Sequence, residues 1–159
     1  VEQPCLDIAD LKALDNETGI KIAVDESIRK FLSSDLTKLK DVADVAVIKW
    51  APSGGISAAL ELIEQISLPV VISSALDSSV GISHGLALAC AIPNLYGACG
   101  LATVALLEGD VTSDSLLASN GAINNRRVVP DQISEFRVDN QRHKWWQDRA
   151  DEIYEGSLI

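Results

Sequence analysis

Residues 45–56 read VAVIKWAPSGGI and predict a strand, a turn and the start of a helix. The first six residues are apolar apart from Lys49 and show no strict alternation with polar residues. Such a run is typical of a strand buried on both faces of a parallel sheet. Pro52 and the pair Gly54-Gly55 then favour a turn. The stretch therefore indicates a βα unit with a lysine near the end of its strand.

Two more apolar runs, residues 20–24 (IKIAV) and 70–73 (VVIS), predict neighbouring strands. Helices are expected over residues 7–14, 57–65 and 83–91. A further helix is expected to start from an N-cap at Ser27 and to run through Ile28 and Phe31. The helix over residues 83–91 is almost entirely apolar, so we expect it to pack on both sides. Alternating strands and helices predict an α/β fold with a parallel sheet.

Polar residues recur near the ends of the successive strand-like runs. Glu2, Asp25, Lys49 and Ser73 follow one another at intervals of about 24 residues, close to the roughly 25–30 residues of one βα unit in a barrel. Equivalent strand ends meet at the carboxyl-end mouth of a barrel, where barrel enzymes carry their chemistry. We therefore expect these four side chains to share one mouth.

Asp25 directly follows a strand-like run, and a carboxylate in that place suits a hard divalent cation such as Mg²⁺. The alternative is an acid at a helix N-terminus, where the helix dipole favours negative charge. Lys49 lies in an otherwise apolar run, and an unpaired buried ammonium costs several kcal/mol, roughly. It either projects into a barrel mouth opposite the carboxylates or reaches solvent past Pro52.

Two turn-prone loops are weaker candidates for binding anions. Gly54-Gly55 precedes a helix and suits either an anion cradle or a plain turn. Residues 73–74 and 77–81 form a polar loop after a strand, whose backbone amides suit a substrate carboxylate. An ordinary βα loop with a capping serine is the alternative for this second loop.

The last third of the chain differs from the rest. Residues 112–125 are rich in Ser, Asn, Asp and Gly and predict a long loop, residues 126–129 (RRVV) suit a strand, and residues 141–153 predict a helix. His84 is expected to pack in the core, and His143 is expected to be solvated. Neither histidine is therefore a candidate base.

Composition narrows the classes of function. The 159 residues are 47% hydrophobic with a net charge of −10, which permits a sizeable core and argues against nucleic-acid binding. The three cysteines, Cys5, Cys90 and Cys99, have no metal-site spacing, and their odd count favours a reducing cytoplasm. The longest apolar run, residues 85–93, is too short to span a bilayer, so no membrane partner is expected.

Seven stretches together resemble the o-succinylbenzoate synthase branch of the enolase superfamily. They are VEQP, AVDESIR, DVADVAVIKWAPSGGI, VVISSALDSSVGISHGLALACAIP, GLATVALLEGDV, RRVVPD and HKWWQDR, and they cover nearly the whole chain in order. The resemblance implies the C-terminal half of a (β/α)7–8 TIM-type barrel, strands four to eight, over residues 1–111. Residues 112–159 would be a linker and the C-terminal segment of an α+β capping domain.

The resemblance also implies roles for individual residues. Glu2 and Asp25 match two of three carboxylate ligands for Mg²⁺, with Mn²⁺ as a possible substitute, and Glu26 matches a residue that orients ligands. Lys49 matches a catalytic lysine at the end of strand six. The residues that match the loop meeting the succinyl arm of the substrate are Ser73, Ser74, Ser79 and Gly81. The implied reaction is a dehydration (hydro-lyase) that forms o-succinylbenzoate from a small carboxylate in menaquinone biosynthesis.

The chain departs from the family in lacking the strand-two K-x-K motif, the first aspartate ligand and most of the capping domain. We therefore expect these parts elsewhere in the molecule. Three alternatives stay open: an N-succinylamino acid racemase, a muconate cycloisomerase-like enzyme, or an inactive fragment that needs its N-terminal half. A dinucleotide-binding fold is disfavoured because no G-x-G-x-x-G follows a strand. The oligomeric state is left open.

Overall fold

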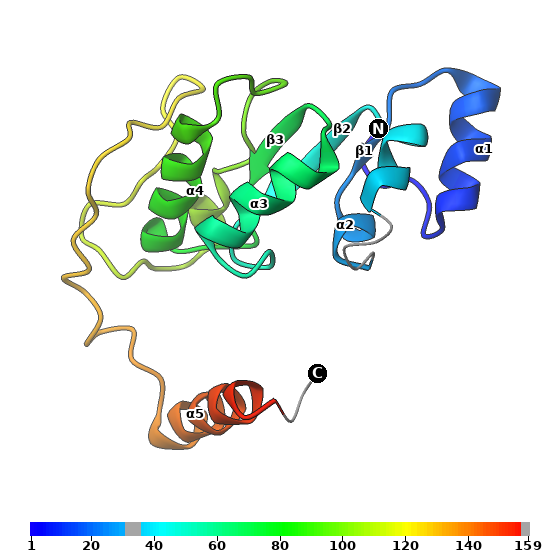
Figure 1. Cartoon of the computed structure of the whole chain (residues 1–159). Helices are drawn as coiled ribbons and strands as arrows, with labels where there is room; N and C mark the ends of the chain where they lie inside the picture. The colour runs from blue at the N-terminus through cyan, green and yellow to red at the C-terminus, as the bar shows by residue number, and fades with distance from the viewer. Residues whose placement is uncertain (31–35, 157–159) are drawn as a thin grey trace.

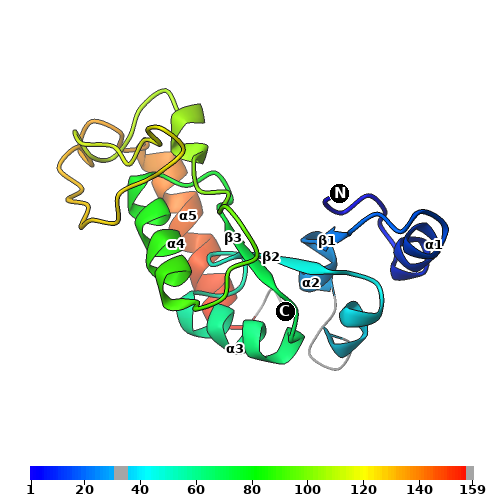
Figure 2. The same cartoon turned by 90° about the horizontal axis from the view of Figure 1, so that it is seen from above.

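A three-stranded parallel sheet forms the centre of the computed structural model, which describes residues 1–30 and 36–156. Its strands lie in the order β1 (Ala23–Val24), β2 (Val45–Lys49) and β3 (Val70–Ser73). The helices are α1 (Ile8–Thr18), α2 (Glu26–Lys30), α3 (Ile56–Ile66), α4 (Ser79–Ala91) and α5 (Asn140–Tyr154), with short 3₁₀ helices η1 (Leu36–Asp41) and η2 (Thr103–Leu106). Figures 1 and 2 show this alternation of strands and helices.

Isolated bridges extend the sheet on both sides. Glu2 pairs in parallel with Ala23 of β1, and Gly100 pairs in parallel with Ser73 of β3. Five parallel segments therefore lie side by side, in chain order. This is the arrangement of a partial (β/α) barrel and confirms the predicted fold class.

The core lies between the sheet and its helices. Val24, Ala46, Ile48 and Ile72 on one sheet face join a cluster with Ala59 and Ile66 of α3 and Ile82 and Leu88 of α4. Fully burying each Ile or Leu contributes about 1.5–3 kcal/mol. The opposite face borders a hollow of about 300 Å³, lined in part by Ala23, Val45, Val47 and Val71. The sheet is therefore packed against helices on one side and open on the other.

The strand predictions hold well. β3 has the predicted bounds, and β2 ends at Lys49, one residue before the expected end. β1 is shorter than residues 20–24, because the N–H of Ile22 bonds the carboxylate of Asp44 at 2.9 Å instead of a strand partner. A hydrogen bond from a backbone N–H to a side chain takes the place of a hydrogen bond to the neighbouring strand, and the strand is then shorter.

Several helix predictions need correction. Ser27 is not an N-cap, because α2 already begins at Glu26; Phe31 lies outside the described residues. Residues 57–65 are helical as expected, within α3. α4 begins at Ser79, before the predicted start, and buries only the face that carries Ile82, Gly85, Leu88 and Ala89. It therefore packs on one side in this chain, not on both.

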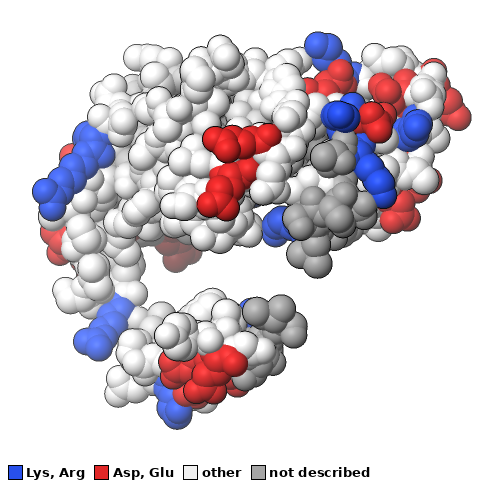
Figure 3. Space-filling model, in the orientation of Figure 1, with Lys and Arg blue, Asp and Glu red and all other residues white. Residues whose placement is uncertain are grey.

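The C-terminal part follows the long-loop prediction but contains no strand at residues 126–129. The guanidinium of Arg126 instead pairs with the carboxylate of Asp114 at 2.9 Å and bonds its carbonyl at 2.6 Å. α5 buries no residue and lies apart from the sheet and its helices (Figure 1). The surface over α4 is mostly uncharged, acidic groups lie over α3, and charged groups of both signs gather over α1 and η1 (Figure 3). No helix of the described residues is both long and apolar enough to cross a membrane.

Candidate active site

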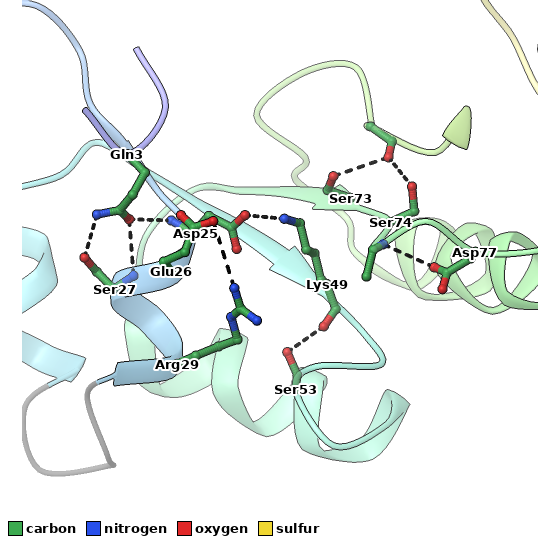
Figure 4. A network of polar contacts seen from close by, with 12 residues as sticks. Gln3, Asp25, Glu26, Ser27, Arg29, Lys49, Ser53, Ser73, Ser74 and Asp77 are labelled. Atoms are coloured by element: carbon green, nitrogen blue, oxygen red, sulfur yellow. Dashed lines mark hydrogen bonds and ion pairs between the residues drawn. The ribbon is translucent and has the colours of Figure 1, made fainter. Parts of the chain in front are cut away.

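The ends of β1 and β2 bring Asp25 and Lys49 into contact. The ammonium of Lys49 donates to Oδ2 of Asp25, which is 3% exposed, while the Lys49 side chain is 21% exposed (Figure 4). The two side chains border a cavity of about 10 Å³ together with Val47 and Ser53. Pairing explains how a lysine persists in this apolar strand, because a buried charge is tolerated when it is compensated.

Glu2 lies on the same sheet face but does not join this pair. Its bridge to Ala23 places it one position before Asp25 along that face, because parallel-paired residues point the same way and side chains alternate along a strand. Glu2 is exposed and lines the larger hollow, while Asp25 lines the smaller cavity; Val47 borders both. The acids therefore face the same side from neighbouring segments.

The donor chemistry of this face fits a hard divalent cation. Mg²⁺ takes one or two protein carboxylates together with waters and substrate oxygens, and Glu2 and Asp25 are carboxylates on one face. The Asp25 carboxylate is paired with the ammonium of Lys49. Among the described residues, no group of three or more His, Cys, Asp or Glu side chains is placed to hold a metal. At this sheet face, the part of the chain that the structure describes therefore offers two carboxylates, those of Glu2 and Asp25.

Gln3 was missed by the sequence reasoning, although it joins the segments that carry both acids. Its Oε1 accepts from the N–H groups of Asp25 at 3.0 Å and Ser27 at 3.2 Å. Its Nε2 donates to the carbonyl of Cys5 and the hydroxyl of Ser27, both at 2.8 Å. Figure 4 shows Gln3 beside the Asp25–Ser27 turn. The only sequence signal was a polar amide next to an expected ligand.

Glu26, which was expected to orient the metal ligands, pairs with Arg29 instead. Its side chain is about half exposed, and its carboxylate lies 4.0 Å from the guanidinium of Arg29 one helical turn later. An exposed pair of this kind contributes about 0–1 kcal/mol. The structure records no bond from Glu26 to Asp25.

The serines at the end of β3 form hydrogen bonds with the neighbouring segment at Gly100. The hydroxyls of Ser73 and Ser74 both donate to the carbonyl of Gly100, at 3.3 and 2.8 Å. The hydroxyl of Ser74 also lies 2.9 Å from that of Thr103, which accepts from the N–H of Asp77 at 3.3 Å. A Cβ at Gly100 would lie 2.8 Å from Oγ of Ser73. Gly100 and Thr103, neither of them predicted, therefore shape this loop.

Ser79 is fully buried and forms hydrogen bonds with Asp110, a further residue that the sequence did not reveal. Its hydroxyl and N–H both donate to the Asp110 carboxylate, and its hydroxyl accepts from the N–H of Leu116 at 2.8 Å. Burial alone would raise the pKa of Asp110. Hydrogen bonds from the Ser79 and Ser115 hydroxyls and from backbone N–H groups outweigh it, so the pKa of Asp110 is lowered.

The glycines of the two loops differ in their constraints. Gly81 lies in the first turn of α4, where a Cβ would come within 2.7 Å of the Cβ of Asp77. Gly54 and Gly55 have φ values of 93° and 107°, and their N–H groups donate to the carbonyls of Ala51 and Trp50. These two amides are used inside the turn, which favours the plain turn over the anion cradle.

The prediction for one histidine is wrong and the prediction for the other is confirmed. His84 is exposed and stacks on Trp50 with ring centroids 4.9 Å apart. The prediction of a packed core histidine is therefore wrong, because α4 turns this position away from its buried face. His143 is exposed, as predicted.

A prediction about stability follows from the Asp110 contacts. A carboxyl whose pKa is lowered by folding stabilises the folded state above its ordinary pKa, and this stabilisation is lost as the pH falls through the lowered pKa. Asp110→Asn is therefore expected to cost about 1–3 kcal/mol at neutral pH. In urea unfolding, the deficit relative to wild type should stay constant from about pH 7 to about pH 5 and shrink below about pH 4, as the pH falls through the lowered pKa. Glu108→Gln, an exposed neighbour, is the control; an Asp110→Asn deficit that does not change with pH would contradict this account.

Comparison with known proteins places the chain among related enzymes. Residues 1–132 match the family described as enolase C-terminal domain-like. The o-succinylbenzoate synthase of Mycobacterium tuberculosis H37Rv is 43% identical over 156 residues, which are 97% of this chain and 48% of that protein. The chain thus spans about half the length of the curated relatives it matches.

Solved structures agree on the fold. Muconate cycloisomerase from Pseudomonas fluorescens has a TM-score of 0.75 at 20% identity, over 87% of this chain and 42% of that one. The N-succinyl Arg/Lys racemase from Bacillus cereus has a TM-score of 0.70 at 23% identity, over 87% and 40%. At these identities the likeness shows the fold alone.

Proposed function

The chain belongs to the enolase C-terminal domain-like family, and on that premise we propose that it carries half of the active site of an o-succinylbenzoate synthase. The observation that carries the proposal is the contact of Asp25 with Lys49 at the ends of adjacent parallel strands. This is where a barrel enzyme presents its catalytic groups. The 43% identity to a curated synthase supports the choice of reaction.

The enzyme that we propose includes a second half in addition to the 159 residues of this sequence. Residues 1–111 would supply strands four to eight of the barrel, and residues 112–159 a linker and part of the capping domain. The open sheet face and the 300 Å³ hollow support this arrangement, because an uncovered apolar face favours further packing. The absence of any buried residue in α5 supports a tail that packs elsewhere. We place the enzyme in the cytoplasm.

Enzymes of the enolase superfamily generally use Mg²⁺. In this chain we propose Glu2 and Asp25 as carboxylate ligands, with Mn²⁺ as a substitute. A bound cation supplies positive charge next to the substrate carboxylate, which makes the adjacent proton easier to remove. Glu26 is proposed to orient this side of the site, and the residues proposed to meet the substrate are Ser73, Ser74, Ser79 and Gly81. The buried bonds of Ser79 favour a role in holding the loop.

Lys49 is proposed to stabilise the anion that forms when the proton leaves a cyclohexadiene carboxylate. Its ammonium lies at the strand end on the face that carries Asp25, and the side chain is mostly buried, where a charge acts more strongly than in water. The lysine that removes the proton, and then assists the departure of hydroxide, would belong to the K-x-K motif outside these residues. Water leaves, and an aromatic succinylbenzoate remains.

The test of the proposed function is turnover by the full-length enzyme. We expect dehydration that EDTA abolishes and that added Mg²⁺ restores, because the carboxylates alone supply no cation. The 159-residue chain alone is the matched control and is expected to be inactive. Turnover that survives EDTA would remove the metal from the proposal, and activity of the short chain would remove the need for a second half.

N-succinylamino acid racemisation is the second candidate, and the fold shared with a B. cereus racemase favours it. In a racemase, Lys49 would transfer a proton instead of stabilising charge. Exchange of the substrate α-proton with solvent deuterium, measured for a succinylamino acid, distinguishes the two. Muconate cycloisomerisation, favoured by the fold shared with the P. fluorescens enzyme, is assayed alongside.

A further inference from the structure

The carboxylate of Asp25 does not cap the helix that follows it, although Asp25 lies directly before that helix. An aspartate just before a helix usually accepts a hydrogen bond from the free N–H groups of the first turn. α2 begins at Glu26, so Asp25 holds that position, yet its carboxylate contacts Lys49 (Figure 4). The N–H of Ser27, in the first turn, and that of Asp25 itself bond Oε1 of Gln3 instead. A glutamine more than twenty residues away thus replaces the local cap.

Gln3 is itself held tightly. Two donors reach its Oε1, and its Nε2 donates to the Cys5 carbonyl and to the hydroxyl of Ser27, which is fully buried. Its backbone N–H donates to the carbonyl of Ala23 at 2.8 Å. Its φ of 37° lies in the left-handed region, which a non-glycine residue keeps only where its surroundings enforce it. Gln3 therefore fixes its own segment against the start of α2.

We propose that Gln3 is a positioning residue for the metal ligands. It caps α2 so that the Asp25 carboxylate is not used by the helix N-terminus and lies on the face that carries Lys49 and the proposed cation site, and it fixes the backbone of Glu2, its direct neighbour, relative to Asp25. The proposal rests on the proposed function, because it assumes that Glu2 and Asp25 hold Mg²⁺. Gln3 itself need not touch the metal or the substrate.

Binding of Mg²⁺ to the full-length enzyme without substrate, measured by titration calorimetry, tests this role. Gln3→Met keeps the side-chain volume but removes the cap, and we expect Mg²⁺ to bind about 10–100-fold more weakly. Gln3→Glu keeps an acceptor for the two N–H groups and is expected to bind Mg²⁺ as well as wild type or better. Ile66→Val, which removes one methylene from a fully buried side chain of α3 and mildly destabilises the fold, is the stability control and should keep wild-type affinity.

The outcomes separate this inference from the proposed function. Wild-type protein that binds no Mg²⁺ would overturn the proposed function, and the role of Gln3 with it. Wild-type affinity in Gln3→Met would overturn only the role of Gln3. Equal weakening in Ile66→Val would overturn it as well, since general destabilisation would then explain the loss. Should Gln3→Met fail to fold, Gln3→Glu decides: retained affinity supports the cap, and lost affinity contradicts it.

Discussion

Full-length enzyme carrying Lys49→Met is expected to lose about 10²–10³-fold in kcat for dehydration. The ammonium of Lys49 is the positive group that the end of β2 presents beside the buried carboxylate of Asp25, and the Lys49 side chain is itself mostly buried. A charge held in such a place stabilises a developing anion without reorganisation, so its removal acts on the transition state. Methionine retains much of the side-chain length, which limits the loss of packing.

Steady-state kinetics with and without the substitution measure this effect. Lys21→Met is the matched control, because Lys21 borders the larger hollow and not the cavity beside Asp25, and its ammonium lies 3.4 Å from the hydroxyl of Tyr96. That variant is expected to keep turnover near wild type. Unchanged kcat in Lys49→Met, with folding confirmed by circular dichroism, would remove Lys49 from the reaction.

Asp25→Ala is expected to have the largest effect on stability, about 3–5 kcal/mol. The substitution leaves the Lys49 ammonium mostly buried without its carboxylate partner, and an uncompensated charge in that setting is costly. The same variant is expected to lose Mg²⁺ binding, because one of two proposed carboxylate ligands is gone. Urea unfolding and calorimetric titration measure the two consequences separately.

A double-mutant cycle shows whether the pair itself is responsible. Asp25→Ala combined with Lys49→Met removes both charges and is expected to recover much of the lost stability, because neither group is then left unpaired. Glu61→Gln, an exposed acid on α3, should stay within about 0.5 kcal/mol of wild type. Purely additive effects of the two single changes would show that Asp25 and Lys49 do not interact in solution.

Residues close in sequence account for the predictions that succeeded. β2 and β3 were found from apolar runs, because burial on both faces leaves a continuous apolar pattern. The strand ends at Asp25 and Lys49 followed from those runs, and the structure brings the two side chains together. The start of α4 was placed too late, because Ser79 is a polar residue that owes its burial to Asp110, 31 residues later.

The amino-acid sequence by itself determined the order of strands and helices, the parallel sheet and the residues at the strand ends, because local hydrophobic periodicity encodes burial. Only the tertiary structure decided that Gln3 caps α2, that Asp110 bonds Ser79 and that Ser74 bonds Gly100. Each of these contacts joins residues more than twenty positions apart. Their partners depend on the register in which the segments align, and no local pattern of residues specifies that register.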